Sequence, residues 1–577
     1  MKQSVFNLNT LKAHPERNAF DLSHNDVFSC APGMLLPISC TEVLPNEHFE
    51  INPQVFLRTM PLNSAAFVRM RQHIEFFFVP MRVLCRQFPQ FVVGTKYPIS
   101  SLDLLNEFSQ KLPSISLANI RDSLVGFKDN DGLGVPLNSG MLRLFDLLGY
   151  GFNSSRKIDA TNYPDSYTSN KVTQASPHLS LLRFGAYQKI YQDFYRNPYW
   201  EAVTPTSFNF DDLFGRSLTF ANNESRLLDI CTLRYRNWSK DFFTCVQPQF
   251  QGSPFVTNKV DMANFMIAPN SFTGKNFTPN TSAVYYNSSI PQPTDSKVAV
   301  LQSEGGSTMT IPIHNIRAAF ALDKLYRLQQ QAGNGSYGEQ IRNRFGFGGV
   351  HDDWKAQYLG GSSAPISIGE VITTANTQNS DSVLGQTGDI YGKASSVNDA
   401  RISFDTREHG IIMGIFSVVP DADYNSNGID PHNFKLGFEQ FFQPEFDRLG
   451  HQPLNNYFLS SIKPYSGVEN GSENWLQRII GFQNRYLEYK TGIDRVHGQF
   501  CSGGSLSAWS APRNSGLLLE ASSSLFNLYS LKVSPKILNS ICSVTFDGTD
   551  KTDPILVDSH ISIKAIRPMS VSDEPLL

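Results

Sequence analysis

The clearest alternation of apolar and polar residues runs from Ala66 to Val79. One face of this stretch carries large apolar side chains, namely Val68, Met70, Ile74, Phe76 and Phe78. The other face carries polar ones, namely Arg69, Arg71, His73 and Glu75. A period of two with one apolar face predicts an antiparallel strand covering a core. Pro80 is expected to end the strand because proline has no N–H for the ladder.

Two stretches in the C-terminal part also predict strands. Residues 411–419 are almost uniformly apolar, which predicts a strand buried on both faces. Near the end of the chain, Ile561, Ile563 and Ala565 alternate with polar residues, and Pro568 follows them. This pattern predicts a half-buried strand.

Helical spacing replaces this alternation in two central stretches. Between residues 179 and 196, apolar side chains step by four beside a second stripe made of Tyr187, Tyr191 and Tyr195. Two stripes predict a helix packed on more than one side. Residues 315–331 predict a second helix, with Asn315 as its N-cap.

Strand patterns thus lie at both ends of the chain, and helices and long polar stretches lie between them. This order argues against regular βαβ alternation. It predicts a mainly β protein, a β-sandwich or jelly roll with elaborated connections, built from both ends of the chain. Residues 251–305 are rich in Asn, Ser, Thr, Pro and Gly but retain aromatic residues, so we expect an ordered surface insertion there.

The composition narrows the class of protein. Of 577 residues, 18% are charged, and 49 Lys and Arg stand against 52 Asp and Glu, which gives a net charge of −3. Such a balance argues against a free-standing nucleic-acid binder, which usually has a basic footprint. We expect no membrane insertion, because no long uncharged apolar run is present. The polar first 20 residues predict no Sec export, and the seven scattered cysteines predict free thiols in a reducing compartment.

One short motif suggests a cation site. Asp423 to Gly428 matches the first half of a calcium loop, and the candidate ligands are Asp421, Asp423, Asn425 and Asn427. Position twelve of the loop is Phe434, so the usual bidentate Glu is missing. An Asx-rich turn explains the same residues. We therefore expect no required cofactor and keep calcium as a hypothesis.

Arginines and aromatic residues interleave along the strand predicted at residues 66–79 and just after it. They are Arg69, Arg71, Arg82, Arg86, Phe76, Phe77 and Phe88. Such a mixture can bind single-stranded nucleic acid by charge and stacking, and Arg69 and Arg71 are the candidate contacts. The alternative is the polar face of a strand in a subunit contact. No nucleophile elbow, zinc-protease helix or phosphate-binding loop accompanies these residues, so we predict no catalytic site.

Several blocks, in order along nearly the whole chain, resemble the major capsid proteins of microviruses, the small tailless phages with circular single-stranded DNA. The similarity is to the gokushovirus-like branch. The blocks include Phe20–His24, Phe77–Arg82, Arg236–Thr244, Glu408–Gly410, Gly481–Lys490 and Ala565–Met569. Residues 183–187 and 193–197 resemble a further element of the family with two departures. Phe184 and Gly185 are additional residues, and Asp193 stands where the family element has Glu. Residues 100–175 and 251–305 match poorly, and residues 100–178 are interpreted as a variable insertion.

The resemblance implies an eight-stranded antiparallel jelly roll forming a single domain over residues 1–577, with a helical insertion at 315–347. It also implies about sixty copies in a T=1 icosahedral shell around circular single-stranded DNA. The expected partners are further copies, a small basic DNA-packaging protein, a scaffolding protein and a host surface receptor. The insertion at 251–305 corresponds in position to a three-fold protrusion, which suggests host attachment. The expected location is the virion, after assembly in the bacterial host cytoplasm.

Two alternatives belong to other functional classes. A spike or receptor-binding virion protein would form a small oligomer and would not close into a shell. A carbohydrate-active β enzyme would need two carboxylates that converge in a cleft.

Overall fold

The computed structural model describes residues 16–93, 111–127, 129–152, 177–220, 223–248, 265–268, 300–303, 324, 354–372, 378–379, 382–383, 390–447, 450–461, 479–513, 531–547 and 553–571. The chain separates into two compact units. The first contains residues 1–249 and 351–577, and the second contains residues 250–350.

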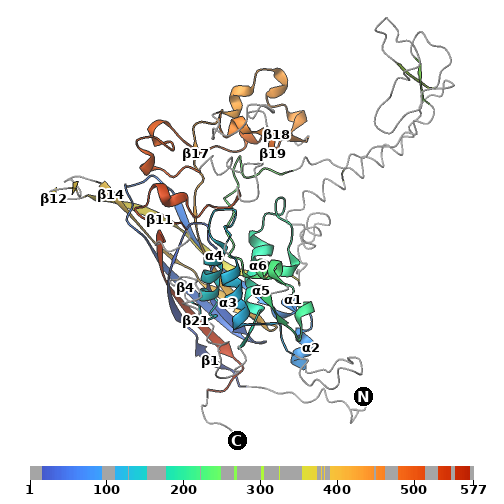
Figure 1. Cartoon of the computed structure of the whole chain (residues 1–577), viewed down its shortest axis with the longest axis vertical. Helices are drawn as coiled ribbons and strands as arrows, with labels where there is room; N and C mark the ends of the chain where they lie inside the picture. The colour runs from blue at the N-terminus through green and yellow to red at the C-terminus, as the bar shows by residue number, and fades with distance from the viewer. Residues whose placement is uncertain are drawn as a thin grey trace. The chain divides into compact units, whose positions relative to one another are not determined.

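A ten-stranded antiparallel sheet forms the centre of the first unit (Figure 1). Its main path runs through β1 (Asn18–Asp21), β21 (Ile555–Arg567), β4 (His48–Thr59), β14 (Ile390–Asp399), β11 (Gln357–Ile372), β5 (Met70–Pro80), β16 (Gly410–Pro420) and β3 (Leu36–Val43). Two strands pair off this path: β2 (His24–Cys30) with β21, and β15 (Ile402–Asp405) with β4. Strands from both ends of the chain are therefore neighbours, since β1 and β2 pair with β21.

The sheet curls around its own apolar face. Phe28 on β2 contacts Phe416 on β16 with ring centroids 5.7 Å apart, although these strands lie far apart along the path. On β21, the buried and exposed residues alternate as the sequence predicts. The predicted doubly buried strand is β16, every residue of which is buried. A polar pair also lies inside: the side-chain amide of Gln72 donates to Ser396 Oγ at 2.9 Å.

A group of short helices lies beside one part of the sheet, and α1, α4 and α5 pack against its strands (Figure 1). They are α1 (Met81–Leu84), α2 (Phe88–Val93), α3 (Leu117–Gly126), α4 (Leu137–Leu147), α5 (Leu182–Ile190) with the π-turn η3 (Tyr191–Tyr195), and α6 (Glu224–Cys231). Helix α5 packs against β5 and β16, and α4 packs against β3. A small sheet of β6 (Ser114–Ser116), β7 (His178–Ser180) and β8 (Ser217–Leu218) joins them.

A smaller apolar core in the first unit joins residues 242–246 to residues 424–487 and Leu531. It gathers Phe242, Phe243, Leu454 and Ile480, among others. Its strands are β17 (Tyr424–Asn425), which pairs with β20 (Arg495–Val496), and β18 (His451–Asn455), which pairs with β19 (Ile479–Asn484). The pair β12 (Gln378–Asn379) and β13 (Ser382–Val383) extends from the β11–β14 connection. In the second unit, β9 (Phe265–Ala268) pairs with β10 (Val300–Ser303).

The mainly β, antiparallel, jelly-roll class that the sequence predicts is confirmed, whereas the count of eight strands is not. The predicted strand at 66–79 is β5, and the predicted helix at 179–196 is α5 with η3. The predicted helix at 315–331 lies outside the described residues apart from Lys324, which is helical. The domain boundaries, including the insertions at 100–178, 251–305 and 315–347, stay predictions.

Candidate functional site

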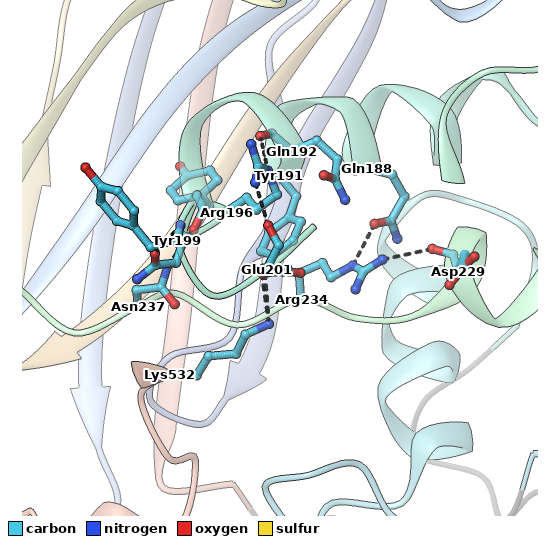
Figure 2. Close-up of polar contacts among 12 residues, drawn as sticks. Gln188, Tyr191, Gln192, Arg196, Tyr199, Glu201, Asp229, Arg234, Asn237 and Lys532 are labelled. Atoms are coloured by element: carbon cyan, nitrogen blue, oxygen red, sulfur yellow. Dashed lines mark hydrogen bonds and ion pairs between the residues drawn. The ribbon is translucent and has the colours of Figure 1, made fainter. Parts of the chain in front are cut away.

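A buried polar network joins helix α5 and η3 to the rest of the first unit (Figure 2). The ammonium of Lys532 donates to Tyr191 Oη at 2.8 Å, and Tyr191 in turn donates to the Glu201 carboxylate at 2.6 Å. Beside it, the Arg234 guanidinium donates to the side-chain oxygen of Gln188 at 2.7 Å and lies over the Tyr191 ring. The buried polar groups of Gln188 and Tyr191 are therefore paired, whereas neither amide atom of the buried Gln192 on η3 has a hydrogen-bond partner among the described residues.

A second part of this network reaches the sheet. Tyr195 Oη donates to the Glu75 carboxylate on β5. Arg236 donates to the same carboxylate at 2.8 Å and to Ser417 Oγ on β16 at 3.0 Å. Glu75 was expected on a solvent-facing side of the strand, but the 234–238 segment and η3 cover it. The tertiary contacts bury this end of the polar face.

Burial sets the protonation of these groups. It raises the pKa of Tyr191, with Glu201 adding to the effect, and that of Tyr195, with Glu75 adding to it. Burial lowers the pKa of Lys532 to about 8, although Glu201 opposes this. It lowers the pKa of His73 to about 4, with Arg236 as the next contribution. Most donors and acceptors of the network are paired, and its chemistry suits a rigid connection between helix and sheet.

The four predicted calcium ligands form ion pairs or hydrogen bonds with several different protein groups. Arg69 pairs with Asp421 at 3.9 Å, with Asp423 at 3.3 Å and with Asp494 at 2.8 Å. Both polar ends of the Asn425 side chain bond to Ser502. Asn427 offers its backbone carbonyl to Ser461. Among the described residues no group of three His, Cys, Asp or Glu could hold a metal ion, and the calcium hypothesis stays a prediction.

The two predicted nucleic-acid contacts differ in their surroundings. Arg69 is 62% exposed, but three carboxylates surround its charge. Arg71 is exposed and forms no ion pair within the described part of the chain.

The remaining arginines of the interleaved set pair with carboxylates. Arg82 pairs with Glu408, and Arg86 pairs with Asp211. Both also lie over the ring of Trp354, which is 53% exposed. The phenylalanines of the set, Phe76, Phe77 and Phe88, are buried and offer no face for stacking.

Large exposed apolar side chains occur in several places on the first unit. They include Val27 on β2, Phe67 before β5 and Val397 on β14. The densest group is the 436–442 segment, in which Leu436, Phe438, Phe441 and Phe442 are exposed. Periodicity analysis misses this segment because its apolar residues follow neither the strand nor the helix period.

None of the helices in the described ranges is both long enough and apolar enough to span a lipid bilayer.

Comparisons with known proteins agree over most of the chain. The family described as capsid protein (F protein) matches residues 9–123 and 151–576. Capsid protein VP1 of Chlamydia phage 1 is 23% identical over 637 aligned residues, covering 97% of this chain and 95% of that protein. Capsid protein VP1 of Bdellovibrio phage phiMH2K is 22% identical over 523 residues, covering 86% of this chain and 85% of that protein.

Proposed function

The chain belongs to the capsid protein (F protein) family, and we propose that its copies close into a T=1 shell around a circular single-stranded DNA genome. Its relatives are structural capsid proteins, so the chain is a structural component of a virion and not an enzyme. The family match over nearly the whole chain is the observation that carries this proposal.

The surface of the first unit supports self-assembly. A closed shell with icosahedral symmetry requires several different contact patches on each copy. Exposed large apolar residues occur on several elements of the first unit, and four of them gather in residues 436–442. Contiguous apolar patches that are exposed to water on a single copy are typical of interaction sites.

The charge of the chain bears on how DNA is held. A net charge of −3 cannot neutralise a packaged genome, so a small basic packaging protein would supply most of the positive charge. Arg69 and Arg71 remain the candidate DNA contacts on this chain. Arg71 is the stronger of the two, because three carboxylates offset the charge of Arg69.

The other partners follow from the same proposal. A scaffolding protein would assist closure in the cytoplasm of the bacterial host. The second unit, which includes residues 251–305, would carry host attachment. Calcium would not be required for the shell.

Assembly of the expressed chain tests the proposal. We would examine it by negative-stain microscopy and light scattering, alone and with the other structural proteins of its phage. Closed isometric shells of uniform size are expected in at least one of the two conditions. A small oligomer that persists in both would contradict the proposal and favour a spike or receptor-binding protein.

A further inference from the structure

The 436–442 segment (Leu436–Phe442) holds four exposed large apolar residues, more than any other seven-residue stretch among the described residues. Leu436 is 89% exposed, and Phe438 on the short 3₁₀ turn η9 (Phe438–Gln440) is 79% exposed. Phe441 and Phe442 are about half exposed, and so is the neighbouring Tyr489. Single exposed apolar residues are common on proteins, but a contiguous group of five is not.

Hydrogen bonds hold this segment in one shape. The side-chain oxygen of Gln440 accepts from the backbone N–H of Leu436 at 2.5 Å and of Gly437 at 2.9 Å. Tyr486 Oη donates to the carbonyl of Phe441 at 3.4 Å. The turn is therefore preorganised, which lowers the entropy lost when the segment binds.

The base of the segment is anchored on a rigid aromatic group. The Phe442 ring lies 5.1 Å from the Tyr486 ring and 6.0 Å from the Tyr489 ring. Tyr486 has a φ of 61°, a left-handed conformation that a tyrosine rarely adopts. Its N–H donates to Gln452, whose side chain donates to Glu488. Such a strained backbone persists only where its surroundings fix it, so the segment projects from a firm support.

The exposed area of the five side chains is large enough to matter for association. With about 200 Å² for a large apolar side chain, their exposed fractions amount to about 600 Å². A standard specific interface buries about 800 Å² on each partner. The segment together with Tyr489 would supply most of one side of such an interface.

We propose that the 436–442 segment is a contact between copies of this chain, in which Leu436 and Phe438 insert into an apolar surface of a neighbouring copy. The inference rests on the proposed self-assembly and names one surface that carries it. Nucleic acid is a poor occupant, since the lysines beside the patch, Lys435 and Lys490, pair with Glu488 and Asp447, and the segment itself adds only the acidic Glu439. An apolar centre with a charged rim is typical of protein–protein interfaces.

The first test compares two double variants with the wild type. In Leu436→Ser/Phe438→Ser, the yield of closed shells is expected to fall at least tenfold, while the folded protein keeps its circular dichroism spectrum. The control, Val27→Ser/Val397→Ser, removes two apolar residues that are 81% and 66% exposed elsewhere, and its yield should stay within twofold of wild type. Equal assembly of the 436/438 variant and wild type would overturn the inference.

The second test identifies the partner directly. The photo-crosslinking amino acid p-benzoylphenylalanine would replace Phe438, and particles would be irradiated after assembly. A product of twice the chain mass that contains only this chain is expected. Crosslinks found only to another virion protein or to host envelope material would overturn the inference. Failure of the wild type to form shells with any of the phage proteins would contradict the proposed function itself. The wild-type samples therefore distinguish that failure from a failure of the contact proposed here.

Discussion

Lys532 is the most deeply buried cation of the network, with 6% of its side chain exposed. Its ammonium donates to Tyr191, and its distance from the Glu201 carboxylate is 3.8 Å. Burial disfavours the charged form, which is why its pKa falls to about 8 in spite of this neighbour. The folded protein therefore binds the Lys532 proton less tightly than the unfolded chain does.

This difference predicts how stability changes with pH. Because the pKa of Lys532 is lower in the folded state, the unfolded chain holds more protons between about pH 8 and pH 10.5. The contribution of Lys532 to the free energy of unfolding therefore increases as the pH rises through this range. Between pH 7.5 and pH 10 the gain is about 2 kcal/mol. We expect Lys532→Met to lose this gain relative to wild type in denaturant titrations.

The control for this prediction is Lys490→Met, which removes a partly exposed lysine paired with Asp447. Its stability relative to wild type should not change over the same pH range by more than about 0.5 kcal/mol, since exposed ion pairs contribute little. A pH profile of Lys532→Met parallel to that of wild type would contradict the assignment.

The sequence predicts the packing of helix α5 but not the shape of its C-terminal end. The four-residue steps and the tyrosine stripe predict a helix packed on several sides, and Tyr187 and Tyr191 are indeed almost fully buried. Phe194, which continues the apolar steps, is 40% exposed instead. The end of the helix widens into the π-turn η3, in which Tyr195 reaches Glu75 on β5. That partner lies 120 residues away, so local spacing cannot predict the turn.

Close packing under α5 makes a second prediction. A Cβ atom added at Gly185 would lie 2.5 Å from the ring of Phe210, which is fully buried. Helix propensity alone would make Gly185→Ala stabilising by about 1 kcal/mol. We expect the steric conflict to dominate and the variant to be destabilised by about 1–3 kcal/mol in thermal or denaturant unfolding.

Gly492→Ala is the matched control, because no atom lies within 4 Å of an added Cβ there. It should unfold within about 0.5 kcal/mol of wild type. An increase in stability for Gly185→Ala would mean that the Phe210 ring moves away at little cost.

The whole first unit depends on pairings between distant parts of the chain. The sequence predicts strands near both ends from their alternation, yet the register of β21 with β4, such as Ile563 opposite Ile51, needs the folded structure. The candidate nucleic-acid contacts are likewise only partly predictable from the sequence. Arg69 and Arg71 could be named from their place on a strand, whereas the three carboxylates around Arg69 come from loops far along the chain.

The separation of residues 250–350 as a compact unit predicts that shell formation and host attachment can be uncoupled. Ala268 on β9 is paired with Val300 on β10, so an Asn-Gly turn can replace residues 269–299 and still close this hairpin. Since the first unit holds the curled sheet, we expect the shortened protein to assemble with normal yield. Adsorption of the particles to host cells, measured as the rate of phage loss from the medium, is expected to fall at least tenfold.

A replacement of the same kind in the first unit provides the comparison. Gln378–Asn379 and Ser382–Val383 form the short pair β12–β13, and an Asn-Gly dipeptide in place of residues 380–381 changes the connection within this pair. Particles with this change should adsorb at the wild-type rate. Failure of the 269–299 variant to assemble would mean that the second unit contributes to contacts between copies, and normal adsorption would remove host attachment from its proposed role.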